Sequence, residues 1–473
     1  MAKARLTFLS KAEEDIIHEK SVEMLEKMGV FVRSDAVLDL LEENGATADR
    51  KKKIAYLPEE MVKEAVSSAP RNFHLRAREK ENDLELPASE LPYITTDGLV
   101  VNVRDIDTGK TRLATRRDFA QFARLADALD SISFFWPIVT ISDVPPELHN
   151  LYELWDSFVN CSMHVQGDCL GPDDAKRQLK LASLIVGGEE ELRKRPVFST
   201  AIDPISPLSF DGAGLEAQVI FSRAGVPVMC QSMCLGGASS PVTLAGTIAM
   251  INAENLASLV VSQSAAPGSP HIYASSSTPA NMATGGINYL APEFLLISAG
   301  AAQMARRYGR PCMVSNWGAG MKGLGIPMSF SELFGYAGTV LTGSDLVPGM
   351  GGLDDAMSCS LEQVVIDSMI WDNFRAFLRS FDVTRETIAL DVVREVGHGN
   401  SFLSHPHTAK NFRKELFFFD REKLEMEATL SDRMVPRAKE IAKRILREHE
   451  PVPLDRAIIS EGEKLLKEYA KEL

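Results

Sequence analysis

The chain has 473 residues, of which 45% are hydrophobic and 25% are charged, and its formal net charge is −14. These values are ordinary for a globular protein, and the excess of acidic residues argues against a nucleic-acid surface, which normally carries a basic patch. No apolar run reaches the roughly 18 residues of a membrane helix, and the amino terminus lacks the hydrophobic core of a secretory signal, so we expect neither.

Residues 1–90 are expected to form an α+β cap that precedes the main domain. Ser10 and Glu13 match the capping box of a helix, and Gly29 is expected to end that helix. The elements expected after it are a helix at Asp35–Glu43, a strand at Lys53–Leu57, a helix from Pro58 and a pair of edge strands within Phe73–Leu86.

Residues 91–380 repeat the order strand, loop, helix. The predicted strands are Tyr93–Thr96, Ser133–Ser142, His164–Cys169, Val197–Ile202, Val228–Leu235, His271–Ser276, Met313–Trp317 and Leu346–Met350. The predicted helices are Arg116–Leu129, Glu147–Val159, Asp173–Val186, Gly214–Ala224, Val242–Ser264, Pro292–Tyr308, Ser329–Thr342 and Leu361–Arg379. Eight such units predict an α/β fold of the (β/α)8 TIM-barrel type. An open doubly wound sheet is the alternative, but Thr96-Asp97-Gly98 is not the glycine-rich turn expected after its first strand.

Residues 381–473 are expected to be a helical extension. A helix is predicted at Glu386–Val396, an ordered loop at Gly397–Thr408, and two amphipathic helices near Met434–Glu448 and Ile458–Leu473. The six cysteines lie between residues 161 and 359 and are expected to be unpaired buried thiols, which indicates a reducing, cytoplasmic compartment.

Polar and aromatic residues follow the predicted strands, where a barrel of this type places its chemistry. The clearest stretch is Cys312–Gly325, in which a short apolar run leads into Asn316, Trp317 and four glycines. The other residues at strand ends are Asp97, Ser142, Asp143, Gln166, Asp168, Thr200, Asp203, Gln231, Met233, Tyr273 and Ser275, and a run of glycines follows the last strand.

Several common catalytic motifs are absent. No His, Cys, Asp or Glu cluster has the spacing of a metal site, and Cys230 and Cys234 lack a nearby His, so no metal is expected. The GxGxxG match that starts at Gly318 comes too far before the next predicted helix to bind a dinucleotide. His405 and His407 are acid–base candidates, although such a loop pair more commonly stabilises local structure. The mouth therefore has aromatic, amide and glycine character, which suits a quaternary ammonium ion held against ring faces.

Four segments carry a resemblance to a known family. They are Ser240-Pro-Val-Thr-Leu-Ala-Gly-Thr, Asn252-Ala-Glu, Tyr289-Leu-Ala-Pro-Glu and Phe402-Leu-Ser-His-Pro-His-Thr, and their order and spacing resemble the trimethylamine:corrinoid methyltransferase family over about residues 10–450. Founding members of that family carry pyrrolysine in the barrel mouth. The corresponding region here, placed within Asn316–Pro327, contains standard residues only, as in the non-pyrrolysine branch that demethylates quaternary amines.

The resemblance implies an enzyme that transfers a methyl group from a quaternary amine to Co(I) of a corrinoid held by a partner protein. Glycine betaine is the leading substrate, with dimethylglycine as its product, and proline betaine and carnitine are alternatives. A quaternary ammonium leaves as a neutral amine, so neither a proton transfer nor a Lewis-acid metal is needed. The competing hypotheses are a barrel lyase or hydrolase that uses Asp203 or His405 as acid–base, and a non-catalytic binder of betaines. A homo-oligomer is also expected.

Three groups of site residues are predicted on this basis. The expected aromatic wall around the ammonium consists of Trp317, Phe135 and Tyr273. The expected donors to a substrate carboxylate are Gln166, Gln231, Asn316, His164, His405 and His407. The expected corrinoid-facing rim consists of Gly318, Gly320, Gly323, Gly349, Gly351 and Gly352.

Overall fold

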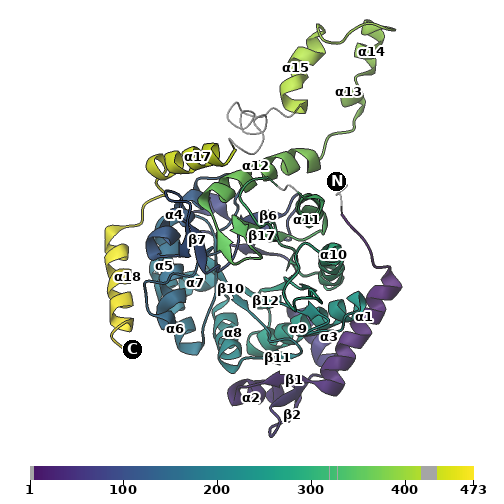
Figure 1. Ribbon diagram of the computed structural model, residues 1–473. Coiled ribbons are helices and arrows are strands. Elements are labelled where there is room, and N and C mark those ends of the chain that lie inside the picture. The colour runs from purple at the N-terminus through teal and green to yellow at the C-terminus, as the bar shows by residue number, and fades with distance from the viewer. Residues whose placement is uncertain (1–4, 319, 327–328, 417–433, 473) are drawn as a thin grey trace.

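The computed structural model describes residues 5–318, 320–326, 329–416 and 434–472. Parallel strands surround a central axis and helices surround the strands (Figure 1). The barrel strands are β6 (Tyr93–Thr96), a short segment at Phe134 and Phe135, β9 (Val165–Gly167), β10 (Phe198–Ile202), β12 (Val228–Ser232), β14 (His271–Ser275), β16 (Cys312–Met313) and β17 (Leu346–Met350).

The ring of strands is closed by hydrogen bonds. Parallel pairing runs from β9 through β10, β12 and β14 to β16, and β17 pairs in parallel with β6. Single parallel bridges join Thr95 to Phe134 and Phe135 to Val165. Strands β16 and β17 are connected where the Trp317 N–H donates to the Pro348 carbonyl at 2.7 Å. A closed barrel is therefore confirmed, and the open doubly wound sheet is wrong.

A helix follows each barrel strand, as the sequence predicted. These helices are α4 (Arg116–Asp127), α5 (His149–Asn160), α6 (Pro172–Val186), α8 (Gly212–Ala224), α9 (Leu244–Ala265), α10 (Pro292–Arg307), α11 (Phe330–Leu341) and α12 (Leu361–Leu378), with a short α7 (Glu189–Lys194) after α6. Helix α9 is long and apolar enough to cross a membrane, but 83% of its most apolar window is buried inside the protein. It is packed between the barrel and helices α1 (Lys11–Glu23) and α3 (Glu59–Ser68), so it is a core helix.

The amino-terminal segment is joined to the barrel by a small sheet in the order β11-β1-β3-β2. Strands β1 (Val30–Val32), β2 (Thr47–Asp49) and β3 (Ile54–Tyr56) come from this segment, together with α2 (Asp35–Glu43), whereas β11 (Ser209–Phe210) lies between β10 and α8. The predicted capping box at Ser10 and Glu13 is confirmed, and a π-helical turn at Met24–Met28 precedes Gly29, which has a φ of +74°.

A β-hairpin closes the amino-terminal end of the barrel. It consists of β4 (Phe73–Leu75) and β5 (Leu84–Leu86), the two predicted edge strands. Leu75, Leu84 and Leu86 pack against the side chains that fill the lower part of the barrel. Arg195, which precedes β10, donates to Asp83 of the hairpin at 2.8 Å. The hairpin therefore forms a floor.

Small strands flank the carboxyl-terminal end of the barrel. Strands β7 (Asn102–Arg104) and β8 (Thr111–Leu113) form one sheet with β18 (Gly352–Leu353) and β19 (Ser358–Cys359), and β13 (Leu235–Gly236) pairs with β15 (Thr278–Pro279). All of them belong to segments that connect a barrel strand to the following helix. They fix the backbone around the carboxyl-terminal mouth.

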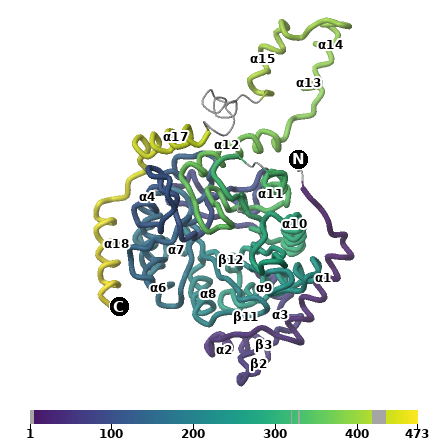
Figure 2. The backbone as a smooth tube through the Cα atoms, in the orientation of Figure 1, coloured from purple at the N-terminus to yellow at the C-terminus, as the bar shows by residue number. Residues whose placement is uncertain are grey.

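The carboxyl-terminal region contains an arm and two packed helices. Residues 379–416 project away from the barrel (Figures 1 and 2) and contain α13 (Arg385–Ile388), α14 (Leu390–Val396) and α15 (Pro406–Glu415). The predicted helix at Glu386–Val396 is interrupted at Ala389, whose φ is +54°. Helices α17 (Met434–Glu448) and α18 (Arg456–Tyr469) follow, and α17 packs on α12 and α4, whereas α18 packs on α5 and α6. All six cysteines are free, as predicted.

Candidate functional site

The alternation of side chains along the strands decides which residues face the barrel lumen. One apolar cluster inside the barrel contains Phe134, Trp136, Ala201, Met229, Ile272, Ala274, Met313 and Leu346. Ala201 and Met229 are direct partners on β10 and β12, and Gln231 is the partner of Ala274 on β14. Asp203 is two residues beyond Ala201, and Gln231 is two residues beyond Met229, so they face the same side as that pair. They therefore lie side by side at the carboxyl end of the lumen.

Two carboxylates sit together at this level. Asp168 follows β9, and its Oδ2 accepts a hydrogen bond from the Trp136 indole Nε1–H at 3.1 Å. Burial and, to a smaller extent, the neighbouring Asp203 raise the pKa of Asp168 to about 7. Desolvation by the surrounding protein also raises the pKa of Asp203, to about 6. Asp203 is exposed to solvent at the carboxyl end of the barrel strands.

A third carboxylate lies where β6 ends. Asp97 is only 3% exposed, and burial raises its pKa to about 7, with Asp367 contributing in the same direction. Its Oδ1 accepts the Gly98 N–H at 3.0 Å. The Trp136 indole packs directly on Gly98, where a Cβ would lie 2.8 Å from the ring. Asp97, Trp136, Asp168 and Asp203 thus follow one another around the mouth.

Several buried oxygen atoms of the mouth have no hydrogen-bond partner within the described part of the chain. They are Asp97 Oδ2, Gln231 Oε1 and Asn316 Oδ1. Gln231 and Asn316 are 7% and 8% exposed, and Gln231 donates its Nε2 to Ser276 Oγ at 2.7 Å. A buried polar atom without a partner is costly unless a ligand completes it. All three atoms are acceptors, and glycine backbone packs closely on two of them, Gly352 on Asp97 Oδ2 and Gly349 on Asn316 Oδ1.

The three predicted wall residues do not face the lumen. Trp317 is fully buried on the outer side of the barrel, with its ring 4.7 Å from Tyr336 and 5.9 Å from Trp371. Phe135 packs edge to face on Phe119 of α4 at 5.8 Å, and the Tyr273 hydroxyl donates to Asn252 of α9 at 3.4 Å. Each side chain fills the layer between strands and helices, so this part of the site prediction is corrected.

Of the six predicted donors, only Gln231 and Asn316 lie at the mouth. His164 is buried deeper, where its ring nitrogens bond the Arg76 carbonyl at 2.6 Å and Ser199 Oγ at 2.8 Å. Burial lowers the pKa of His164 to about 4, so its ring is neutral. Gln166 accepts from Ser199 at 2.7 Å and donates to the Gly167 carbonyl at 3.1 Å. Both residues complete an internal network.

The two remaining donors lie in the projecting arm. His405 is the N-cap of α15, and its Nε2 is 3.1 Å from Glu395, while the His407 N–H bonds the His405 ring at 3.1 Å. The arm leaves the barrel body (Figure 1), so these residues do not join the mouth. The pair stabilises the start of a helix.

The predicted glycine rim is mostly packed rather than open. A Cβ on Gly349 would lie 2.1 Å from the Trp317 carbonyl, and a Cβ on Gly352 would lie 2.0 Å from Asp97 Oδ2. Close approach also explains the glycines at 318, 320 and 351, where a Cβ would lie 2.5, 2.5 and 2.4 Å from the nearest atom. Gly323 is exposed with nothing within 4 Å. Most of these glycines therefore let the mouth loops pack.

Trp136 is the residue that the sequence prediction missed. It lies next to Phe135, which was chosen instead, and a shift of one residue moves a side chain from one face of a strand to the other. The signal was available in the polar residues Asp97 and Asp203, which immediately follow predicted strands, and Asp168, which lies at the end of one. In the structure Asp168 and Asp203 lie together, and Trp136 extends from Asp168 to the Gly98 backbone beside Asp97, whereas the chosen aromatic residues lie outside the lumen.

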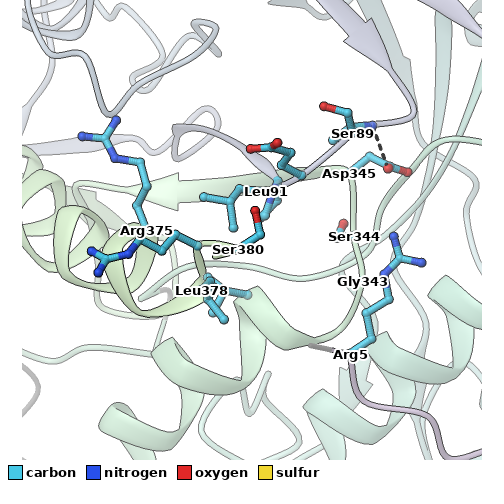
Figure 3. Close-up of a pocket in the computed structure, with 14 residues that line it drawn as sticks. Arg5, Ser89, Leu91, Gly343, Ser344, Asp345, Arg375, Leu378 and Ser380 are labelled. Atoms are coloured by element: carbon cyan, nitrogen blue, oxygen red, sulfur yellow. Dashed lines mark hydrogen bonds between the residues drawn. The ribbon is translucent and has the colours of Figure 1, made fainter. Parts of the chain in front are cut away.

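A cavity lies away from these residues. It has a volume of about 270 Å³ and is lined by residues that include Arg5, Leu91, Asp345, Arg375 and Arg379 (Figure 3). Apart from Arg5 and Val340, the lining residues precede β6 or β17 or lie at the end of α12 and just after it, so this cavity is at the amino-terminal side of the barrel strands. Barrel enzymes carry their chemistry at the opposite end, and we do not place the active site here.

The surface around the mouth is apolar. Large exposed hydrophobic side chains occur in segments after nearly every barrel strand: Val101, Leu170, Ile205, Met233, Val242, Met282, Ile287, Phe330, Leu333, Phe334 and Met357. Exposed apolar side chains of this kind, three of them on α11, occur in surfaces that bind a second molecule. No group of three or more His, Cys, Asp or Glu side chains that could hold a metal occurs among the described residues.

Comparison with known proteins identifies relatives that span the whole chain. Residues 2–471 match the model of a family described as trimethylamine methyltransferase (MTTB). The chain is 33% identical to trimethylamine methyltransferase MttB of Desulfitobacterium hafniense (strain DSM 10664 / DCB-2), covering 99% of this chain and 95% of the relative. It is 28% identical to glycine betaine methyltransferase of D. hafniense (strain Y51), covering 99% and 98%. The Methanosarcina barkeri monomethylamine methyltransferase (MtmB) matches over 92% of both chains, with a TM-score of 0.51 and 12% identity, which supports the fold alone.

Proposed function

The chain belongs to the trimethylamine methyltransferase family, and we propose that it transfers a methyl group from a quaternary amine to the corrinoid of a partner protein. One observation carries the choice of a cationic substrate. Asp168 and Asp203 lie together at the mouth, Asp97 follows β6 at the same end of the barrel, and no ion pair to any of them occurs among the described residues. A bound cation would supply the missing charge.

The chemistry needs little from the protein beyond placement. When the N–CH3 bond of a quaternary ammonium breaks, nitrogen keeps the electron pair and the product is a neutral tertiary amine. The methyl group passes to Co(I) of the acceptor, and no proton moves. Orientation of the N–CH3 bond toward the opening and exclusion of water are the contributions that lower the barrier. We propose that the cation packs against Trp136, whose indole N–H donates to Asp168.

The corrinoid is proposed to arrive with its own protein. A resident corrinoid would need a deep cavity of its own, whereas the exposed apolar side chains around the mouth suit a docked partner that presents the macrocycle from outside. In this arrangement the corrinoid is a substrate and the chain has no tightly bound cofactor. The cytoplasmic location expected from the free cysteines is part of the same proposal.

The substrate within this class has two supported candidates. Glycine betaine is favoured by the sequence prediction and by the name of one relative, and proline betaine and carnitine share its carboxylate. The structure offers few donors for a carboxylate, since only Gln231 and Asn316 of the predicted set reach the mouth. A quaternary amine without a carboxylate is therefore the second candidate.

A barrel lyase or hydrolase remains the alternative function because of Asp203. Its raised pKa of about 6 is a value that suits a general acid or base. His405 no longer supports this alternative, since it lies in the arm. Turnover of an unmethylated substrate without any corrinoid would favour the alternative.

The proposal is tested by methyl transfer to free cob(I)alamin, followed by the absorbance of methylcobalamin. The purified chain is offered glycine betaine, proline betaine, carnitine, choline, tetramethylammonium and trimethylamine. We expect transfer from at least one quaternary amine and none from trimethylamine. Reactions without enzyme or with the Asp168→Asn variant are the controls. Tight amine binding with no transfer, to cob(I)alamin or to a corrinoid protein, would refute methyltransferase activity on these substrates.

Self-association is proposed as well. The projecting arm exposes Phe381, Val383, Ile388, Leu390, Val393, Phe402 and Leu403, and a second copy of the chain would remove these side chains from water. Light scattering of the purified full chain should give a mass that is a multiple of 51.9 kDa. A monomer at micromolar concentration would contradict this expectation.

A further inference from the structure

The charges around the mouth are unevenly distributed. The segments that connect barrel strands to the following helices comprise residues 97–115, 137–148, 168–171, 203–211, 233–243, 276–291, 314–329 and 351–360. Only residues 97–115 and 314–329 contain Lys, Arg or His. The loops that build the carboxyl end of the barrel are thus nearly free of positive charge.

The basic residues in those two segments are engaged or exposed elsewhere. Arg112 on β8 bonds both Asp105 and Asp118 at 2.6–3.2 Å. Lys322 is 57% exposed and pairs with Asp355 at the surface of the loops. Arg104 and Lys110 belong to the β7–β8 hairpin segment and are exposed. None of these cations is among the causes of the pKa shifts of Asp168 and Asp203.

A second, independent observation comes from a neutral side chain. Gln231 is 93% buried, since 7% of it is exposed, and it lies beside Asp203 on the lumen face of β12. Its Oε1 has no partner in the described part of the chain. This unpartnered oxygen lies next to two carboxylates and adds one more acceptor to the same group.

We infer, on the basis of the proposed function, that the amine accepted by this site carries a quaternary ammonium and no carboxylate, with Asp168 and Asp203 as its counter-ions and Gln231 as a neutral neighbour. Choline and tetramethylammonium are the simplest members of this class. Electrostatic attraction to carboxylates does not need a hydrogen-bond donor on nitrogen, and methyl groups of an ammonium make favourable contacts with oxygen.

Zwitterionic betaines fit poorly against Asp168, Asp203 and Gln231. In glycine betaine one carbon separates the nitrogen from the carboxylate, so an ammonium held at Asp168 and Asp203 brings the substrate's own carboxylate close to them. Like charges at such distances repel strongly in a partly desolvated site. Relief of this repulsion would need a buried Lys, Arg or charged His, which the loops do not supply near the two aspartates.

Equilibrium binding tests the inference without any corrinoid. Calorimetric titration of the full chain at pH 8 with tetramethylammonium, choline and glycine betaine gives three values of Kd. We expect glycine betaine to bind at least about tenfold more weakly than choline. Asp168→Asn should weaken choline binding by at least fivefold and narrow the difference between the two ligands, and Asp203→Asn should do the same. Asp143→Asn, an exposed carboxylate that caps α4, is the matched control and should change neither value.

The binding and methyl-transfer assays together distinguish failure of this inference from failure of the proposed function. If glycine betaine binds as tightly as choline, the inference is overturned, and methyl transfer from glycine betaine to cob(I)alamin would still support the proposed function. If choline binds tightly but no quaternary amine yields methylcobalamin, the proposed function fails while the charge selectivity of the site stands. Unchanged choline affinity in folded Asp168→Asn and Asp203→Asn variants would remove these residues from the site.

Discussion

The affinity for a quaternary amine should depend on pH even though the amine itself does not titrate. Only ionised Asp168 and Asp203 attract a cation, and their pKa values are raised to about 7 and about 6. Affinity is therefore full above pH 8 and falls as protons bind. If both groups must be ionised, lowering the pH from 8 to 6 weakens binding roughly twentyfold, because at pH 6 both carboxyls are ionised in only a small share of molecules.

The measurement is the Kd of tetramethylammonium, together with KM in the cob(I)alamin assay, between pH 5.5 and 8.5. Positive charge on nitrogen decreases as the methyl group leaves, so the carboxylates hold the substrate more strongly than the transition state, and KM should change more than kcat. In the Asp168→Asn variant, the pH dependence of Kd should reflect the titration of Asp203 alone. Asp143→Asn should leave the pH dependence unchanged. A Kd that is constant over this range in the native protein would refute the assignment of these carboxylates.

Three further predictions concern residues of the mouth. Asp97→Asn should stabilise the protein by about 4 kcal/mol at pH 8, because a pKa raised from 3.8 to about 7 disfavours the ionised carboxylate in the folded state by about 1.4 kcal/mol per pKa unit. The gain should be much smaller below pH 4, where Asp97 is largely protonated in the folded and the unfolded chain, and denaturant unfolding at both pH values measures this. Gly351→Ala should cost at least about 2 kcal/mol, because φ is +86° and a Cβ would lie 2.4 Å from Val364, whereas exposed Gly323→Ala should stay within about 0.5 kcal/mol by the same assay. Trp136→Leu should weaken tetramethylammonium binding about fivefold, while Phe135→Leu should lower Tm and leave Kd unchanged.

The barrel could be predicted because its signal is local and repeated. Each strand is a short apolar run, each helix has its own apolar face, and the closing turns carry Gly or Pro, so eight units were recognised near their observed positions. Helix α2 at Asp35–Glu43 and helix α17 at Met434–Glu448 match the predicted bounds. These features depend on neighbours in the sequence.

The site could be predicted only in part because it depends on strand parity and on contacts between distant segments. In a parallel barrel both faces of a strand are buried, so Phe135 and Trp136 are equally apolar in sequence and only the closed ring decides which one faces the lumen. The same ambiguity misplaced Tyr273 and Trp317. Asp203 was recognised as a strand-end residue, but its proximity to Asp168 appears only when β9 and β10 are paired.

The floor formed by the β4–β5 hairpin has a kinetic consequence for the proposed reaction. Leu75, Leu84 and Leu86 close the amino-terminal end of the barrel, so amine, corrinoid protein and demethylated product all share the opening at the other end. An amine bound at Asp168 and Asp203 lies beneath the surface on which the partner would dock. The amine must then enter before the partner, and the product must wait until the partner leaves. At a saturating concentration of the corrinoid protein, turnover should consequently be limited by dissociation of that protein. Excess corrinoid protein should inhibit the reaction at low amine concentration.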